Sequence, residues 1–338
     1  MNAACWLLTP LAIVYAGAMR GRNLYYERVH SAVRAAGVPV ISVGNLTTGG
    51  TGKTPLVIEL ARRLVAFNRH PAILTRGYRA HAREAADEVQ EFQNSHLDTP
   101  VIVNPDRVAG AAAAIAQGAD CLIMDDGFQH RRLARDLDIV LIDALQPWGH
   151  GWVLPAGRLR EPLSSLRRAD VFVITRANQT TPENVVAIAD QLQAYGDDKL
   201  IVEAEVQAEA LVGQDGRRRP TTDLGGRRVL AVCGIGNPQT FEKLLRALSV
   251  TVSATLTYAD HHRYRVGDID AISAAARRVG AELVVTTRKD WVKLAPLWST
   301  SAVDLLRLDV RPRFTIGAEE FDTRLRRALG LPTEAQRG

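Results

Sequence analysis

A glycine-rich segment, GGTGKT at residues 49–54, follows an apolar run at residues 38–43. Glycines let backbone N–H groups approach phosphate oxygens with no Cβ in the way. Pro55 suits the first turn of a following helix, whose N-terminus offers free N–H groups and the positive end of a dipole. This order of strand, glycine loop, Lys-Thr and helix predicts a phosphate-binding loop, although the first glycine of the usual pattern is Thr47 here. The alternative is a glycine turn followed by a chance lysine.

The loop also predicts a nucleotide and its metal ion. In loops of this kind the lysine reaches the β- and γ-phosphates, and the hydroxyl that follows it binds Mg²⁺. We therefore expect ATP and Mg²⁺ as cofactors, with Thr54 as a metal ligand. The predicted nucleotide-binding residues are Thr47, Thr48, Gly49, Gly50, Thr51, Gly52, Lys53 and Thr54.

Two adjacent carboxylates follow another apolar run. Residues 122–124 are Leu-Ile-Met, and Asp125, Asp126 and Gly127 come next. Carboxylates at the carboxyl end of a buried parallel strand face the ligand edge of the sheet. Neighbouring aspartates repel each other unless a cation lies beside them. We predict that Asp125 and Asp126 hold Mg²⁺, directly or through water, and a solvated acidic turn is the alternative.

Apolar runs alternate with helical patterns in the first 200 residues. Near-continuous apolar strands separated by helices predict a parallel sheet that is covered on both faces. The expected helices are at 56–67 and 107–117, and the expected strands are at 38–43, 72–75, 101–103, 121–124, 139–142 and 171–175.

A second, smaller α/β block follows a charged, turn-rich stretch at residues 213–228. Its expected strands and helices are at 229–233, 238–248, 251–256, 268–279 and 282–286, in chain order. Two flanking runs, 200–206 and 303–310, are expected to pair as a two-stranded linker. The predicted fold is α/β, with a P-loop NTPase parallel sheet, flanking helices and a second smaller α/β domain. The predicted divisions are an N-terminal membrane-associating segment (1–36), a P-loop domain (37–200), linker and smaller domain (201–312), and a C-terminal helix and tail (313–338).

Composition bounds the class of protein. A length of 338 residues exceeds one ordinary compact core, so two domains are expected. The net charge of +5, from 42 basic and 37 acidic residues, is too balanced to imply nucleic-acid binding. Cys5, Cys121 and Cys233 are scattered and give neither a disulfide framework nor a metal-binding spacing, which favours a reducing cytosol.

The first 19 residues carry no charge, and Arg20 and Arg22 follow them. The apolar run at 5–19 is short for a membrane span. Ala16-Gly17-Ala18 resembles the cleavage site of a signal peptide, but no positive charge precedes the run. We expect a helix in the cytoplasmic leaflet of a membrane, with its arginines at the headgroups. A buried N-terminal helix is the alternative.

Further segments match a known family in order along the chain. They are VGN at 43–45, TRGY at 75–78, DR at 106–107, DDGFQH at 125–130, LPAG at 154–157, LREPL at 159–163, DHH at 260–262 and TRKD at 287–290. With these segments the sequence resembles the tetraacyldisaccharide 4′-kinases of lipid A synthesis over roughly residues 6 to 315. The DDGFQH and LREPL segments are highly specific.

The resemblance implies an activity and a location. ATP would phosphorylate the 4′-hydroxyl of tetraacyldisaccharide 1-phosphate at the cytoplasmic face of a Gram-negative inner membrane. The implied partners are that lipid substrate and the membrane surface, with no nucleic acid and no evident protein partner.

The resemblance also implies a catalytic Asp–His pair, Asp87 and His261. The family's Gly-Asp-Glu-Pro motif reads Ala86-Asp87-Glu88-Val89 here, so both carboxylates remain while the flanking glycine and proline do not. A positioned base helps a sugar hydroxyl lose its proton, and a carboxylate is the usual base in phosphoryl transfer. The residues expected to bind substrate are Arg76, Tyr78, Glu88, Arg107, Gln129, His130 and Arg160.

Two other functions compete. A P-loop GTPase would need a guanine-reading N-K-x-D or T-K-x-D segment, and the nearest stretch, TRKD at 287–290, has its lysine next to its aspartate in the wrong register. A P-loop kinase or ligase for a soluble metabolite is the second alternative, and the apolar N-terminus argues against it.

Overall fold

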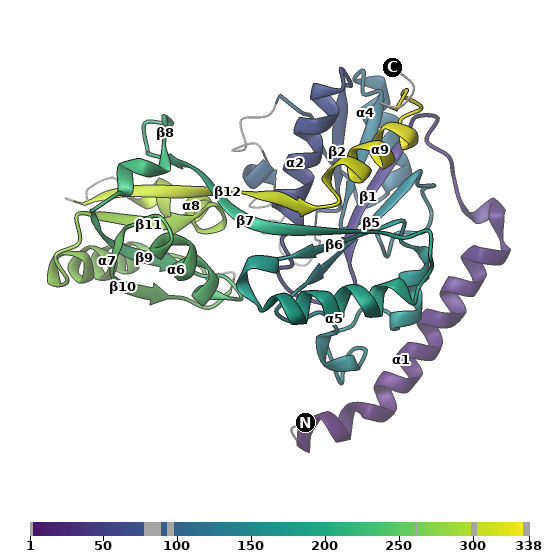
Figure 1. Ribbon diagram of the computed structural model, residues 1–338, viewed down its shortest axis with the longest axis horizontal. Coiled ribbons are helices and arrows are strands. Elements are labelled where there is room, and N and C mark those ends of the chain that lie inside the picture. The colour runs from purple at the N-terminus through teal and green to yellow at the C-terminus, as the bar shows by residue number, and fades with distance from the viewer. Residues whose placement is uncertain (1–2, 78–88, 93–97, 261, 299–302, 334–338) are drawn as a thin grey trace. The chain divides into compact units, whose positions relative to one another are not determined.

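The computed structural model describes residues 3–77, 89–92, 98–260, 262–298 and 303–333 (Figure 1). The chain forms two compact units. The larger one comprises Met1–Ala82, Ser95–Glu205 and Pro312–Gly338, and the smaller one Arg83–Asn94 and Val206–Arg311. Each unit has an apolar core of its own.

The sheet of the larger unit has the strand order β12-β7-β6-β5-β1-β4-β2-β3. The pairs from β6 to β3 are parallel, and β6 pairs parallel with β7. The strands are β1 (Val40–Asn45), β2 (Pro71–Thr75), β3 (Val101–Val103), β4 (Cys121–Asp125), β5 (Leu137–Asp143), β6 (Val171–Thr175), β7 (Leu200–Val212) and β12 (Asp304–Ile316). Every residue of β1, β2, β4 and β6 is buried, which explains why these strands read as continuous apolar runs.

Helices cover both faces of this sheet. The helices are α2 (Lys53–Ala66), α4 (Arg107–Ala116), α5 (Pro182–Gln193) and α9 (Ala318–Ala328). The crossover β1-α2-β2 runs along the sheet in one direction, and β3-α4-β4 and β6-α5-β7 run in the other. Because such crossovers are right-handed, α2 lies on one face and α4 and α5 lie on the opposite face. The chain therefore reverses direction at β1, and ligands of open parallel sheets bind outside the carboxyl end of a strand at this position.

A long helix, α1 (Ala3–Arg28), precedes the sheet and contains Pro10. Its Ala12 is buried in the apolar cluster that also holds Phe128 and Leu159. Its other side is apolar and open, since Leu7 is 81% and Val14 71% exposed. Among the described residues, no helix combines the length and the apolar character that crossing a membrane requires.

In the smaller unit β10, β9, β11 and β12 pair in parallel, and helices lie on both faces. The strand order is β10-β9-β11-β12-β7, and β8 pairs antiparallel with β7. The apolar residues of α6 pack with one side of β9, and those of α7 pack with the other. The additional elements are β8 (Arg218–Arg219), β9 (Arg228–Cys233), α6 (Pro238–Arg246), β10 (Thr251–Thr257), α7 (Val266–Arg278), β11 (Leu283–Thr287) and α8 (Arg288–Leu294).

The expected α/β class with a mostly parallel sheet is confirmed, with differences at the element ends. β7 continues to Val212, whereas the sequence predicted its end at residue 206. From Glu203 to Glu209 acidic or amide side chains alternate with apolar ones, and this part of the strand is only half-buried. Because that polar alternation lacks the continuous apolar signal of the central strands, the extension was not recognised.

Candidate functional site

The phosphate loop begins at the carboxyl end of β1 and leads into α2. Gly52 directly precedes the helix with φ +88°, a conformation that L side chains rarely adopt. Because glycine has no side chain, it does not cap the first N–H groups of α2. The loop therefore presents a positive helix end at the carboxyl edge of the sheet, as an anion site requires.

Lys53 is held by two groups at this edge. Its Nζ donates to Asn45 Oδ1 at 2.9 Å and lies 3.3 Å from Asp126 Oδ1. Asn45 in turn donates to the carbonyl of Thr47 at 2.7 Å. The Lys53 ammonium is thus held between the carboxyl ends of β1 and β4. The role of Asn45 was not predicted from the sequence, although its position at the end of β1 is a signal for it.

Asp126 lies between two cations. Arg160 Nη1 donates to both of its carboxylate oxygens, at 2.9 and 2.7 Å, and Lys53 is its other partner. Burial by itself would raise the pKa of Asp126, but the charges of Lys53 and Arg160 outweigh it and lower the pKa to about 2. The carboxylate is therefore ionised at neutral pH. Of the residues predicted to bind substrate, Arg160 contacts Asp126, which is a predicted metal ligand.

Asp125 ends β4, and its side chain is buried. The guanidinium of Arg107, at the start of α4, donates to the main-chain carbonyls of Asp125 at 3.0 Å and of Asn104 at 3.3 Å. Arg107 is only 3% exposed. These contacts favour a role in holding the end of β4, whereas the sequence suggested substrate binding.

Side chains from other segments fix the outer surface of the phosphate loop. Thr175 Oγ1, at the end of β6, donates to the Thr51 carbonyl at 3.0 Å, and Arg176 donates to the Gly50 carbonyl at 2.6 Å. Arg158 Nη2 donates to the Thr48 carbonyl at 2.9 Å. Sequence reasoning missed Thr175 and Arg176. Thr175 and Arg176 follow a predicted strand at the same sheet edge, which was the available signal.

The DDGFQH segment packs tightly on β1. A Cβ at Gly44 would lie 2.6 Å from Phe128 Cβ, and one at Gly127 would lie 2.6 Å from Ser42 Oγ. Glycine at these two positions therefore allows the segment to approach the central strand. This approach places Gln129 beside the loop, where its Nε2 donates to the Asn45 carbonyl at 3.1 Å.

His130 is partly buried and lies near the charges of Arg107 and Arg135. Burial, together with the charges of these two arginines, lowers its pKa from 6.5 to about 4. The imidazole is therefore neutral at pH 7 and cannot serve as a cation for a phosphate group.

The remaining predicted residues are less constrained. Arg76 is exposed just beyond β2. Tyr78, Asp87, Glu88 and His261 lie outside the described residues.

The TRKD segment has a structural role within the smaller unit. Thr287 Oγ1 binds Asp290, which also accepts from the N–H of Gly234 at 2.9 Å and the hydroxyl of Tyr264 at 3.1 Å. Asp290 is 0% exposed, so it joins the ends of three segments inside the unit. Within the same unit, Lys289 Nζ binds Asp260 Oδ1 at 2.6 Å.

The chemistry available at this edge suits a nucleotide and a hard divalent cation. Lys53 and the start of α2 suit phosphate oxygens, and Thr54 and Asp126 offer hard oxygen ligands. Within the described part of the chain, no group of three or more histidine, cysteine or acidic side chains is arranged to hold a metal ion. Mg²⁺ commonly takes one or two carboxylates and completes its shell with substrate phosphates and water, so this donor set fits it.

Comparison with known proteins gives one consistent result. Residues 4–330 match the family described as tetraacyldisaccharide-1-P 4′-kinase. A tetraacyldisaccharide 4′-kinase of Halothermothrix orenii is 40% identical over 76% of this chain and 74% of its own length. One of Anaeromyxobacter dehalogenans is 39% identical over 96% and 89%, respectively. Among solved structures, LpxK from Aquifex aeolicus in complex with ATP matches with a TM-score of 0.75 and 27% identity, over 96% of this chain and 99% of that one.

Proposed function

This chain belongs to the tetraacyldisaccharide-1-phosphate 4′-kinase family, and from that membership we propose how its residues carry out the reaction. The enzyme is a lipid kinase. It transfers the γ-phosphoryl group of ATP to the 4′-hydroxyl of tetraacyldisaccharide 1-phosphate, a step of lipid A biosynthesis. The family match over nearly the whole chain carries this conclusion. The ready-formed phosphate loop with Lys53 is the structural feature that agrees with it.

Phosphoryl transfer depends mainly on positioning and on compensation of charge. In our proposal Lys53 contacts the β- and γ-phosphates, while the N–H groups of residues 49–54 bind the remaining phosphate oxygens. Arg160 lies against Asp126 and therefore brings a second cation close to the transferring group. The side chains bonded to the loop carbonyls keep this arrangement rigid before ATP arrives.

We propose that Mg²⁺ is held by Thr54 and Asp126, with Asp125 close by at the end of β4. When bound, it would neutralise developing charge on the phosphate oxygens. The support is the donor chemistry: Asp126 stays ionised because Lys53 and Arg160 offset the cost of its burial. At neutral pH it can therefore act as a ligand without first losing a proton.

Acceptance of the proton from the 4′-hydroxyl is assigned to Asp87, with His261 as its partner. This proposal rests on the family resemblance of the segments that carry both residues. Arg76, Tyr78, Glu88, Gln129 and Arg160 are proposed to contact the lipid substrate. His130 is proposed as a neutral neighbour of that site because its pKa is about 4.

The open apolar side of α1 suggests that the enzyme works at a membrane surface. Leu7, Leu11, Ile13 and Val14 are all more than half exposed. An apolar helix side of this kind binds the boundary between headgroups and acyl chains, and the exposed Arg20 beside it would attract anionic lipids. Arg22, which the sequence also suggested for the headgroups, instead donates to the Gln129 carbonyl. We propose the cytoplasmic face of the bacterial inner membrane as the location, since ATP and the lipid substrate meet there.

One assay tests the proposed roles of the loop. The purified enzyme is given γ-labelled ATP and tetraacyldisaccharide 1-phosphate in detergent micelles, and labelled 4′-phosphorylated lipid is quantified. Lys53→Ala should abolish transfer while the melting temperature stays close to that of the wild type, because the lysine contributes little to the core. Lys243→Ala, which removes an exposed lysine of α6, is the matched control. Transfer by Lys53→Ala at the wild-type rate would disprove the loop assignment.

A further inference from the structure

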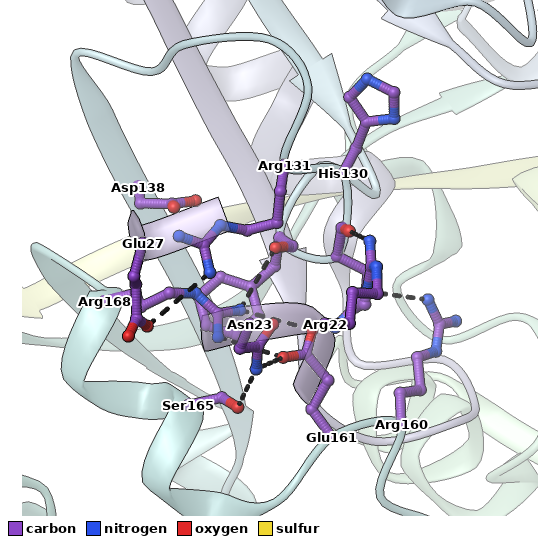
Figure 2. A network of polar contacts seen from close by, with 12 residues as sticks. Arg22, Asn23, Glu27, His130, Arg131, Asp138, Arg160, Glu161, Ser165 and Arg168 are labelled. Carbon is purple, nitrogen blue, oxygen red and sulfur yellow. Dashed lines mark hydrogen bonds and ion pairs between the residues drawn. The ribbon is translucent and has the colours of Figure 1, made fainter. Parts of the chain in front are cut away.

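The polar contacts of α1 converge on two segments that also supply the phosphate site (Figure 2). One segment contains Gln129 and Arg131, and the other contains Arg160, Glu161 and Ser165. Arg22 donates to the Gln129 carbonyl, and Glu27 lies 4.0 Å from Arg131. The contacts of Asn23 and Tyr15 reach the second segment. The inner side of α1 is thus bonded to the segments that carry DDGFQH and LREPL.

The first connection runs through Arg160. Its carbonyl accepts the hydroxyl of Tyr15 at 2.9 Å, and its N–H donates to the Leu46 carbonyl at 2.7 Å. The main chain of Arg160 is therefore held from one side by α1 and from the other by the residue after β1. The side chain of the same residue donates to both carboxylate oxygens of Asp126. A shift of α1 would be passed to the carboxylate through one residue.

The second connection runs through Gln129. Its carbonyl accepts from Arg22 of α1, and its side chain donates to the Asn45 carbonyl at 3.1 Å. Asn45 Oδ1 accepts from Lys53 Nζ at 2.9 Å. The two connections therefore meet at Lys53, which lies between Asn45 and Asp126.

Glu161 anchors the helix. Its side chain is 0% exposed, and Arg168 Nη1 lies 3.0 Å from its Oε2. Asn23 Nδ2 donates to the same oxygen at 2.7 Å and to Ser165 Oγ at 3.1 Å. Burial would raise the pKa of Glu161, but Arg168, Asn23 and Ser165 hold it below its usual value. A buried carboxylate needs all of these partners, so it defines one position of α1 rather than a range of positions.

We propose that Tyr15, Arg22 and Asn23 are positioning residues for phosphoryl transfer. Their contacts with Arg160, Gln129 and Glu161 hold Asp126 and Lys53 in the arrangement that the reaction uses. The proposal gives the inner side of α1 a task separate from binding of its outer side to lipid. It rests on the roles proposed above for Lys53 and Asp126.

Tyr15→Phe is the first test, with Tyr25→Phe as its matched control. The first substitution removes the hydroxyl that Arg160 binds and keeps the ring in the apolar cluster. Tyr25 lies on the same helix and is 53% exposed. With saturating lipid in micelles, kcat of Tyr15→Phe should fall about three- to tenfold, the effect of one lost hydrogen bond, and Tyr25→Phe should match the wild type. The KM for lipid should stay within about twofold in both, because Tyr15→Phe leaves the outer side of α1 unchanged and Tyr25→Phe keeps an aromatic ring at its exposed position.

The second test exchanges the amide of Asn23 and the carboxylate of Glu161 between the two positions. Asn23→Asp places a carboxylate against that of Glu161 and should lower kcat about tenfold or more, because like charges repel at buried positions. Adding Glu161→Gln restores one donor and one acceptor, so the double variant should recover kcat to within about threefold of the wild type. Melting temperatures and calorimetric ATP affinities are measured for each variant. If Asn23→Asp does not fold, the kcat of Tyr15→Phe alone tests the positioning role of α1.

The outcomes separate this proposal from the role of the phosphate loop. Unchanged kcat in Tyr15→Phe, with only the KM for lipid raised, would mean that α1 serves lipid capture alone and would overturn the positioning role. A folded double variant that remains as slow as Asn23→Asp would overturn the coupling through Glu161. Full activity of Lys53→Ala would instead reject the loop assignment on which the proposal rests.

Discussion

Asp126 illustrates how neighbouring charges prepare a residue for its task. Its carboxylate is ionised because Lys53 and Arg160 outweigh the cost of burial. The sequence predicted an acidic pair at a strand end, but it did not predict which cations accompany it. Arg160 is 34 residues away along the chain, so only the fold brings the two together.

Asp126→Asn should lower kcat about 10²–10³-fold, the range for losing one group that stabilises transition-state charge. Activity should then require more Mg²⁺, because an amide is a poorer metal ligand than a carboxylate. Asp125→Asn should respond to Mg²⁺ in the same way if this carboxylate also holds the ion. Rates are measured across a series of Mg²⁺ concentrations, and Asp190→Asn, which changes an exposed aspartate of α5, serves as the control. Wild-type Mg²⁺ curves in both variants would move the metal site elsewhere.

His130 should make the protein sensitive to mild acid. Its pKa is about 4 in the folded chain and 6.5 when unperturbed, so the unfolded chain binds the proton more tightly. Stability should therefore fall as the pH drops from 6.5 toward 4. His130→Gln should show a smaller decrease in melting temperature between pH 7 and pH 5 than the wild type. Equal decreases in the two proteins would show that His130 titrates normally.

Some secondary-structure elements have a recognisable sequence pattern, and others do not. The central strands β1, β4 and β6 are buried on both faces and appear as apolar runs. The outer part of β7 alternates polar and apolar residues, and its end was placed six residues too early. For α1 the sequence predicted an apolar helix with arginines after it. Its inner contacts through Asn23 and Tyr15 depend on residues far along the chain and had no sequence signal.

The outer side of α1 yields a prediction about membrane binding. A variant carrying Leu11→Glu and Val14→Glu should bind anionic phospholipid vesicles more weakly and show a higher KM for micellar lipid. Its kcat at saturating lipid should change little, since the inner contacts of the helix remain. Val186→Glu, an equally apolar exposed position on α5, controls for added charge. Vesicle sedimentation measures binding, and unchanged sedimentation would favour a helix whose apolar side meets something other than lipid.

At the scale of the whole molecule, the sequence predicted the chemistry at one sheet edge better than its supporting contacts. Lys53, Asp126 and Arg160 were predicted and lie together. Asn45, Thr175 and Arg176 were not, because they act through main-chain carbonyls or through Lys53. Such contacts depend on register and loop shape, which a motif does not encode. Asp87 and His261 belong to the predictions that only kinetics will test.

If Asp87 and His261 act as one unit, their effects should not multiply. Each alanine variant should lose about 10²–10⁴-fold in kcat, the usual effect of a lost acid–base group. The double variant should be little slower than the slower single variant, because each residue would contribute to catalysis only when the other is present. Calorimetric ATP binding should persist in all three, since Lys53 is unchanged. Losses that multiply would assign the two residues to separate steps.

The close approach of the DDGFQH segment to β1 has a consequence for anyone who screens variant libraries of this enzyme. No side chain larger than hydrogen fits at Gly44, because a Cβ there would lie 2.6 Å from Phe128 Cβ and 2.7 Å from its main-chain nitrogen. Libraries selected for growth should therefore lose every substitution at Gly44, as completely as they lose substitutions of Lys53. Intolerance at Gly44 would reflect loss of folded protein, whereas intolerance at Lys53 would reflect loss of activity. Measuring abundance alongside growth would separate the two causes, with Lys53 variants abundant but inactive and Gly44 variants depleted from the cell.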